Sequence, residues 1–203
     1  MELKYKLEPR EYYIDPINAQ DNERIIELRL GINWYKKIIE AGRKNNIIEI
    51  GNVLGWYGYP EHRCIDKFAE DPDISAAGEV EKIDALDEDL TDKDVICIST
   101  IEHLGLSDYD NPNPNDGEDA ITLLDKIVAE AKSYFITFGP NHNKRLDEYI
   151  KSHLVDFERS WEWHGWCRKD VGEWDYVAQD MKVWEMKKDT PFPSENGLIL
   201  LKK

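Results

Sequence analysis

IIEIGNVLGWYG, residues 47–58, is the stretch on which the interpretation of the chain depends. Three isoleucines and Glu49 have the composition of a buried strand, which runs into Gly51 and is followed by a second glycine, Gly55. A strand that ends in glycine is typical of the turn that holds a cofactor, but glycine also occurs wherever the backbone turns sharply. The two glycines alone therefore leave both interpretations open.

Strand-like and helical segments alternate on both sides of this stretch. Apolar runs predict strands at 47–51, 63–66, 80–86, 94–100 and 133–139, and helical spacing predicts helices from Asn22, as N-cap, to Gly42 and within 117–133 and 144–154. This alternation predicts an α/β fold with a mostly parallel sheet, helices on both faces and ligands at the carboxyl ends of the strands. The strand-like GLILLKK, 197–203, predicts an antiparallel C-terminal edge.

The bulk composition indicates one domain, which we place at 22–203 after an irregular arm at 1–21. The 203 residues include 42 acidic and 26 basic side chains, a net charge of −16. Such a charge repels phosphates and anionic lipid heads, so we expect neither nucleic acid nor a membrane as a partner. The chain lacks an apolar run of about 18 residues and an apolar signal-peptide core, which predicts a cytoplasmic protein.

Polar residues at successive strand ends are a more specific signal than the glycines. In a doubly wound sheet an acid after the second strand can bind the ribose hydroxyls of an adenosine group, and Asp66 in RCIDKF has this position. DVICISTIEHLG, 94–105, closes a strand with Ser99 and Thr100 and then delivers Glu102 and His103. A turn at Asp66 and a helix start at 99–102 explain the same residues structurally.

Taken in order, EIGNVLG, CIDKF, DVICISTIEHLG, FITFGPNHNKRLDEYI and TPFPSENGLIL resemble motifs of small class I S-adenosylmethionine-dependent methyltransferases. Some members of this group are associated with sugar and polysaccharide biosynthesis. The resemblance covers the chain from about residue 24 to the C-terminus. It implies a Rossmann-like, seven-stranded sheet with S-adenosylmethionine bound across the switch point.

The resemblance also implies the site residues. Glu49, Gly51 and Asn52, with Gly55 beyond them, form the first cofactor loop, and Asp66 binds the ribose. The remaining cofactor and acceptor positions are, in chain order, Glu81 and Asp84 beside the adenine, and Ser99, Thr100, Glu102 and His103 at the methionine end. His103 has the residue type of a general base for a hydroxyl acceptor, and Glu102 would orient it or bind the acceptor.

The first loop departs from the E-x-G-x-G-x-G pattern, because Asn52 and Val53 stand where small residues are usual. Only about eleven residues separate Gly51 from the strand near Arg63, and a parallel crossover needs about a dozen or more. We therefore expect the first crossover helix to be one turn long or missing. The aromatic residues of GWYGYPEH, 55–62, then either cover the site or pack in the core.

Other signals are weaker. SDYDNPNPNDGEDA, 107–120, is rich in oxygen ligands but lacks the spacing of a calcium loop, so we expect a solvated loop and no metal. His142 and Asn143 in GPNHN either contact an acceptor or cap the next helix. The tryptophans of 161–184 pack the edge strands or stack on a sugar. Cys64, Cys97 and Cys167 are expected to be buried small hydrophobes.

The leading hypothesis is a methyltransferase acting on a small polar acceptor, such as a sugar or sugar nucleotide. Two alternatives remain open. One is a Rossmann-like binding or assembly module whose cofactor site has changed, as the short crossover suggests. The other is an enzyme that uses a nucleotide sugar or dinucleotide, which shares the role of Asp66 but lacks a G-x-G-x-x-G run. The sequence leaves the oligomeric state undetermined.

Overall fold

The computed structural model describes residues 23–59, 62–69, 79–107, 114–154, 162–170, 173–178, 180–185 and 197–203. The expected arm, 1–21, and the expected cap Asn22 lie outside these ranges, so the proposed domain boundary stays a prediction. Within the ranges, none of the helices combines the length and the apolar character that a membrane span requires.

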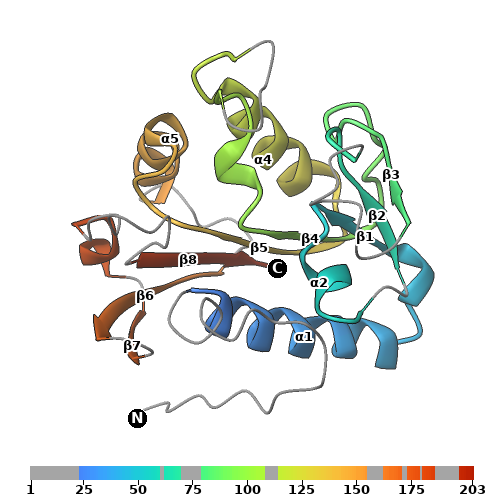
Figure 1. The fold of residues 1–203 in the computed structure, drawn as a ribbon, viewed down its shortest axis with the longest axis horizontal. Coiled ribbons are helices and arrows are strands. Elements are labelled where there is room, and N and C mark those ends of the chain that lie inside the picture. Colours follow the sequence, from blue (N-terminus) through green and yellow to red (C-terminus); the bar gives the residue numbers. More distant parts are fainter. Residues whose placement is uncertain are drawn as a thin grey trace.

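In the described part of the chain, eight strands form one sheet in the order β3-β2-β1-β4-β5-β8-β6-β7 (Figure 1). Pairing is parallel from β3 to β5 and antiparallel among β5, β8, β6 and β7. The bounds are β1 Ile47–Ile50, β2 Arg63–Ile65, β3 Val80–Glu81, β4 Asp94–Ile98, β5 Ser133–Phe138, β6 Glu162–Asp170, β7 Glu173–Ala178 and β8 Gly197–Lys202. The α/β prediction with an antiparallel C-terminal edge is confirmed. An eighth strand is added because the chain reverses after β6 and pairs again as β7.

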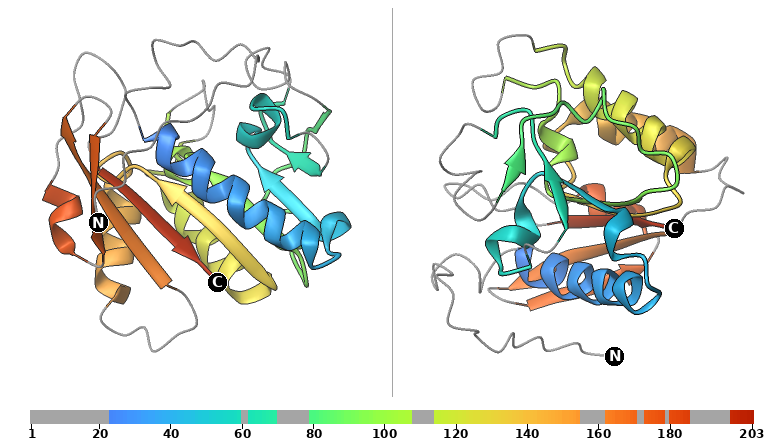
Figure 2. Two further views of the ribbon diagram at one scale, coloured as in Figure 1. Left: turned by 90° about the horizontal axis from the view of Figure 1, so that it is seen from below. Right: turned by 90° about the vertical axis from the view of Figure 1, so that its right-hand side faces the viewer.

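Helices cover both faces of the sheet, as expected. Figures 1 and 2 show α1 on one face and α4 and α5 on the other. The α-helices are α1 Arg24–Glu40, α2 Val53–Trp56, α4 Glu118–Glu130 and α5 Lys144–Leu154, and the 3-10 helices are η1 Lys44–Asn46, η2 Ile101–His103 and η4 Met181–Glu185. The four-residue α2 confirms that the first crossover helix is short.

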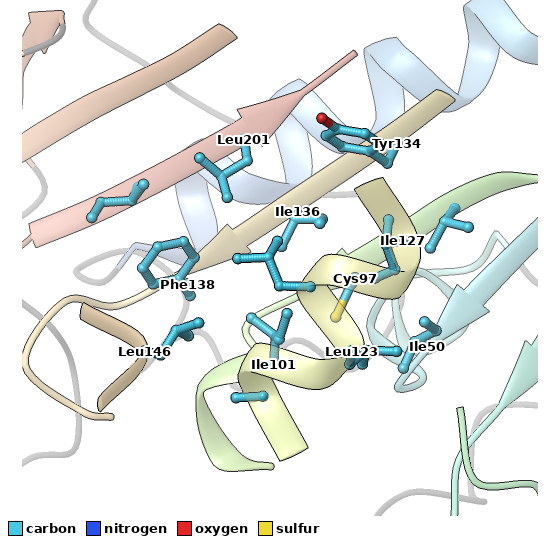
Figure 3. Packing of buried hydrophobic residues seen from close by; sticks show 14 of the residues in the cluster. Ile50, Cys97, Ile101, Leu123, Ile127, Tyr134, Ile136, Phe138, Leu146 and Leu201 are labelled. Atoms are coloured by element: carbon cyan, nitrogen blue, oxygen red, sulfur yellow. The ribbon is translucent and has the colours of Figure 1, made fainter. Parts of the chain in front are cut away.

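Alternation along the central strands divides the core into two layers, because successive side chains point to opposite faces of a sheet. In β4, Val95 and Cys97 pack beneath α4, whereas Ile96 and Ile98 pack against α1. Figure 3 shows the α4 layer, with Leu123 and other α4 side chains close to Cys97 and the strands. All three cysteines are buried, as expected, and none of them forms a disulfide.

Gly31 explains how α1 comes so close to the sheet. A Cβ atom there would lie 3.0 Å from Ile98 Cδ1 and 3.4 Å from Phe135 Cε1. The helix therefore accepts the usual cost of an interior glycine, roughly 1 kcal/mol, in exchange for close packing on β4 and β5.

The strand predicted at 80–86 is wrong after Glu81. Asp84 Oδ1 accepts a hydrogen bond from the Leu86 amide at 3.0 Å, and a turn covers 85–87. This local side-chain-to-backbone bond competes with strand pairing, and it places Ile83 and Asp84 at the cavity described below.

Candidate active site

A cavity of about 280 Å³ lies at the carboxyl ends of β1, β2 and β4. Strands β1 and β4 are neighbours, but the chain continues from β1 outward to β2 and from β4 outward to β5. This is the switch point of a doubly wound sheet, where ligands bind in such folds. Ligand pockets commonly measure about 300 to 1,000 Å³, so the cavity is close to the lower limit of this range, the size of a site for one small ligand.

The turn after β1 forms one wall, through Gly51 and the buried Asn52. Gly51 has φ +78°, and a Cβ atom there would lie 2.3 Å from Thr100 Oγ1. Only glycine combines this backbone conformation with such close approach to the end of β4. Gly55 does not line the cavity, because it is buried inside α2. Glu49 does not line it either, and its contacts are described below.

Two carboxylates of the cavity wall, those of Asp66 and Asp84, come from the segments directly after β2 and β3. Asp66 Oδ1 accepts a hydrogen bond from the Phe68 amide at 2.7 Å, and Asp84 forms the equivalent bond with Leu86. Both residues line the cavity. The structural and functional interpretations of Asp66 are therefore compatible, since one oxygen closes the turn while the side chain borders the cavity. Glu81 is not in the wall: it points outward and pairs with Arg63, with Nε–Oε1 at 2.8 Å.

The end of β4 supplies Ser99, Thr100 and His103 to the opposite wall. Ser99 has φ +42°, a conformation that is uncommon outside glycine. Its Oγ donates a 2.6 Å hydrogen bond to Glu27 Oε1, which also accepts one from Thr137 Oγ1 at 2.7 Å. The fully buried Glu27 carboxylate on α1 thus holds the ends of β4 and β5.

Glu102 lies beneath the wall rather than in it. Its side chain is buried, and Oε1 accepts a hydrogen bond from the Gly139 amide at 3.1 Å. Burial raises the pKa of Glu102 to about 8, so the carboxyl is mostly protonated at neutral pH. The prediction that Glu102 acts directly on an acceptor therefore has no support from its position, because it borders β5 instead of the cavity.

His142 and Asn143 occupy different positions relative to His103. The rings of His103 and His142 have centroids 4.3 Å apart in an edge-to-face arrangement, so His142 contacts a wall residue without lining the cavity itself. Asn143 is buried, and its Oδ1 accepts a hydrogen bond from the Leu146 amide at 3.0 Å. Asn143 therefore caps α5, which is the structural alternative that the sequence left open.

The cavity also has wall residues that the sequence reasoning missed. Arg24, on the first turn of α1, reaches the wall and pairs with Glu27, with Nη1–Oε2 at 3.0 Å. Trp56 is 45% exposed at the wall, next to the turn after β1. A buried acid on the apolar face of a helix, flanked by Ile26 and Leu28, is the signal by which Glu27 could have been found.

Trp163, Trp166 and Trp184, in the C-terminal region, serve packing. Trp166 and Trp184 are buried, and Trp184 Nε1 donates a 2.9 Å hydrogen bond to Asp147 on α5. Trp163 and Trp184 have ring centroids 5.5 Å apart. Trp161 and residues 108–113 of the loop expected to be solvated, 107–120, lie outside the described residues.

No model of a known protein family matches the chain, and no curated protein matches it in sequence. Similar solved structures include an N-methyltransferase of Bradyrhizobium japonicum WM9 in complex with S-adenosyl-L-homocysteine, with 12% identity, a TM-score of 0.46 and coverage of 93% of this chain and 90% of that one. A SAM-dependent methyltransferase of Archaeoglobus fulgidus has 14% identity, a TM-score of 0.43 and coverage of 85% and 93%.

A magnesium protoporphyrin IX methyltransferase of Synechocystis PCC 6803 with bound SAM has 14% identity, a TM-score of 0.42 and coverage of 91% and 85%. A putative rRNA methylase of Clostridium thermocellum is also similar, with 8% identity, a TM-score of 0.43 and coverage of 87% and 96%. At these identities the likeness concerns the fold and transfers no substrate to this chain. The expected exclusion of nucleic acid stays a prediction that rests on charge alone.

Proposed function

We propose that the protein is an S-adenosylmethionine-dependent methyltransferase. The observation that carries the proposal is the composition of the cavity at the switch point. There the Gly51 turn, Asp66 after β2, and Ser99, Thr100 and His103 after β4 face one space. These are the elements that the resemblance to small class I methyltransferases assigns to the cofactor.

The residues present fit such a cofactor. Gly51 keeps the backbone of the first turn free of a Cβ atom at its closest approach to β4. Asp66 borders the cavity with a carboxylate, the group that accepts hydrogen bonds from ribose hydroxyls. Ile83 and Ala85 supply apolar surface beside Asp84, which suits an adenine ring. Asn52 and Val53, where the first loop departs from the family pattern, both lie in the cavity wall.

When bound, the cofactor would supply a methyl group on a sulfonium, a reaction that needs chiefly alignment of the acceptor. For a hydroxyl acceptor a base must take the proton, and His103 is the wall residue with the suitable side chain. Trp56 and Arg24 border the same space and offer an aromatic face and a cation. They suit a small polar acceptor such as a sugar or sugar nucleotide, which is the finer part of the proposal.

Thermal unfolding of the ligand-stripped protein tests the proposal. The ligands are S-adenosylmethionine, S-adenosylhomocysteine, NAD and several nucleotide sugars, each added alone. A ligand at about 100 times its Kd stabilises the fold by about 2.7 kcal/mol, or roughly 5 to 10 °C for a chain of this size. A rise with the sulfur ligands supports the proposal. Cooperative unfolding without that rise contradicts it, and a rise with NAD or a nucleotide sugar favours the corresponding enzyme.

Once an acceptor hydroxyl is identified, His103→Ala tests the assignment of the base. We expect a loss of about 10²- to 10⁴-fold in kcat with little change in S-adenosylhomocysteine affinity. His153→Ala, on α5 and outside the cavity wall, is the control and should keep the wild-type rate. Turnover by His103→Ala at the wild-type rate would remove this residue from the chemistry.

A further inference from the structure

The connection between β1 and β2 contains a buried pair of polar side chains that the proposed reaction does not use. His62 Nε2 lies 2.6 Å from Glu49 Oε2, and the two side chains are 1% and 0% exposed. Glu49 belongs to β1 and His62 directly precedes β2. The pair therefore joins the two ends of the connection inside the protein.

The second oxygen of Glu49 binds the connection in its middle. Glu49 Oε1 accepts a 2.7 Å hydrogen bond from the Leu54 amide in the first turn of α2. Leu54 is fully buried against α1, and its carbonyl accepts hydrogen bonds from the amides of Tyr57 and Tyr59 at 3.1 and 3.0 Å. One carboxylate thus holds both the start of α2 and, through Leu54, the loop that follows.

His62 is held in place from the side of α1. Its ring centroid lies 5.2 Å from that of Tyr35, in an edge-to-face contact. Tyr35 also contacts Tyr59 at 5.8 Å. The pair is consequently fixed to a long helix as well as to the two strands, which restricts where the connection can lie.

The cavity depends on this connection. Gly51, Asn52, Val53 and Trp56 all line the cavity, and all lie between Glu49 and His62. A four-residue helix has no stability of its own, since isolated helices shorter than about 12 residues are marginal. Packing and the bonds of Glu49 must therefore keep this wall in position.

We propose that His62 and Glu49 are positioning residues that hold the cavity wall in place of a full crossover helix. The inference rests on the proposed function for the identity of the ligand, S-adenosylhomocysteine, but not for the structural step. If it is right, breaking the pair loosens the wall before it unfolds the sheet. Ligand affinity then falls by more than the change in global stability accounts for.

The test uses three variants of the full chain. His62→Phe keeps a ring against Tyr35 and removes the partner of Glu49, whereas His62→Gln keeps a hydrogen-bond donor. Glu49→Leu/His62→Phe removes both polar groups, which avoids an unpaired buried carboxylate and preserves folding if His62→Phe alone does not fold. His164→Phe is the matched control, because His164 also pairs through a ring nitrogen, with Tyr176 at 2.7 Å, but lies outside the cavity wall.

Two readouts separate this inference from the proposed function. Amide hydrogen exchange of 51–59 needs no ligand, and calorimetric titration with S-adenosylhomocysteine measures affinity. We expect His62→Phe and the double variant to exchange these amides at least tenfold faster and to bind about tenfold more weakly, with recovery in His62→Gln. Wild-type exchange of 51–59 in the variants would overturn the inference. If the variants exchange faster but the wild type binds no S-adenosylhomocysteine, the positioning role stands and only the identity of the ligand, and with it the proposed function, is contradicted.

Discussion

The two crossovers beside the cavity are built in opposite ways. Between β4 and β5 the chain forms the thirteen-residue α4, and four of its side chains, Ala120, Leu123, Leu124 and Ile127, are buried on the sheet. Between β1 and β2 it forms only the four-residue α2, tied down by the buried Glu49–His62 pair. One crossover is held by apolar area along a whole helix face, and the other by the buried Leu54 together with the polar contacts of Glu49.

The difference shows that one crossover mainly contributes stability and the other mainly shapes the cavity. Burying a leucine or isoleucine side chain contributes roughly 1.5 to 3 kcal/mol, so α4 stabilises the sheet whether or not a ligand is present. The connection after β1 instead leaves Gly51, Asn52 and Trp56 facing the cavity. Substitutions in α4 should therefore change stability, and substitutions after β1 should change binding.

Among the substitutions that test this comparison, Leu123→Ala should have the largest effect, which is on the free energy of unfolding. Leu123 is fully buried in the α4 layer, and such a truncation costs about 2 to 5 kcal/mol of unfolding free energy. Thr122→Ala, exposed on the same helix, should stay within about 0.5 kcal/mol. Urea unfolding measures both. S-adenosylhomocysteine affinity should be unchanged in folded Leu123→Ala, and a parallel loss of affinity would show that the two crossovers are not independent.

Gly51→Ala should have the next largest effect, on binding. Gly51 and Gly42 have similar positive φ values, +78° and +73°, so alanine meets comparable backbone strain at both. Only at Gly51 does the new Cβ collide with Thr100, since nothing lies within 4 Å of a Cβ at Gly42. We expect Gly51→Ala to lower S-adenosylhomocysteine affinity about 10- to 100-fold in calorimetry. Equal affinities in the two variants would mean that this close approach does not shape the site.

The helices α4 and α5 and the ends of the parallel strands were predictable from the sequence. Helical spacing predicted α4 and gave both bounds of α5, Lys144–Leu154, because burial of one helix face leaves a clear period in the sequence. The residues predicted at strand ends, Gly51, Asp66 and Ser99, do line one cavity, since parallel strands bring their carboxyl ends together.

The buried polar contacts around the cavity were predictable from the sequence only in part. Glu49 was assigned to the cofactor loop by the resemblance to small class I methyltransferases, but its partner His62 is thirteen residues away and no local pattern links the two. The partners of Glu27 could not be predicted for the same reason, because Ser99 and Thr137 bond it across 72 and 110 residues. Contacts between distant residues leave no period in the sequence.

Asp66→Asn sharpens the assignment of the ribose site. Asparagine still closes the turn by accepting the Phe68 amide, so the substitution removes the charge and keeps the local structure. Since a hydrogen bond to a charged group contributes about 1.5 to 3 kcal/mol and the amide retains part of it, affinity for S-adenosylhomocysteine should fall about five- to thirtyfold. Asp89→Asn is the control, because Asp89 bonds the Thr91 amide in the same way but is exposed and outside the wall. Unchanged affinity would place the ribose elsewhere.

Glu102 is an exception to this contrast between apolar and polar regions, because it is a buried carboxyl beside β5, where the core is otherwise apolar. Its pKa is raised from 4.5 to about 8 by burial, so the folded protein binds a proton between these values that the unfolded chain releases. The resulting stability is complete below about pH 4.5 and is lost as pH rises through about 8.

Glu102→Gln should remove this pH dependence of stability. The glutamine side chain has no titratable proton, and its oxygen can still accept a hydrogen bond from the Gly139 amide. Between pH 6 and 7, we expect the unfolding free energy of the wild type to fall relative to that of Glu102→Gln by about 1 kcal/mol. Glu148→Gln, exposed on α5, should follow the wild type at every pH. If Glu102→Gln also follows it, the Glu102 carboxyl is ionised where it lies, and the core beside β5 contains a buried charge.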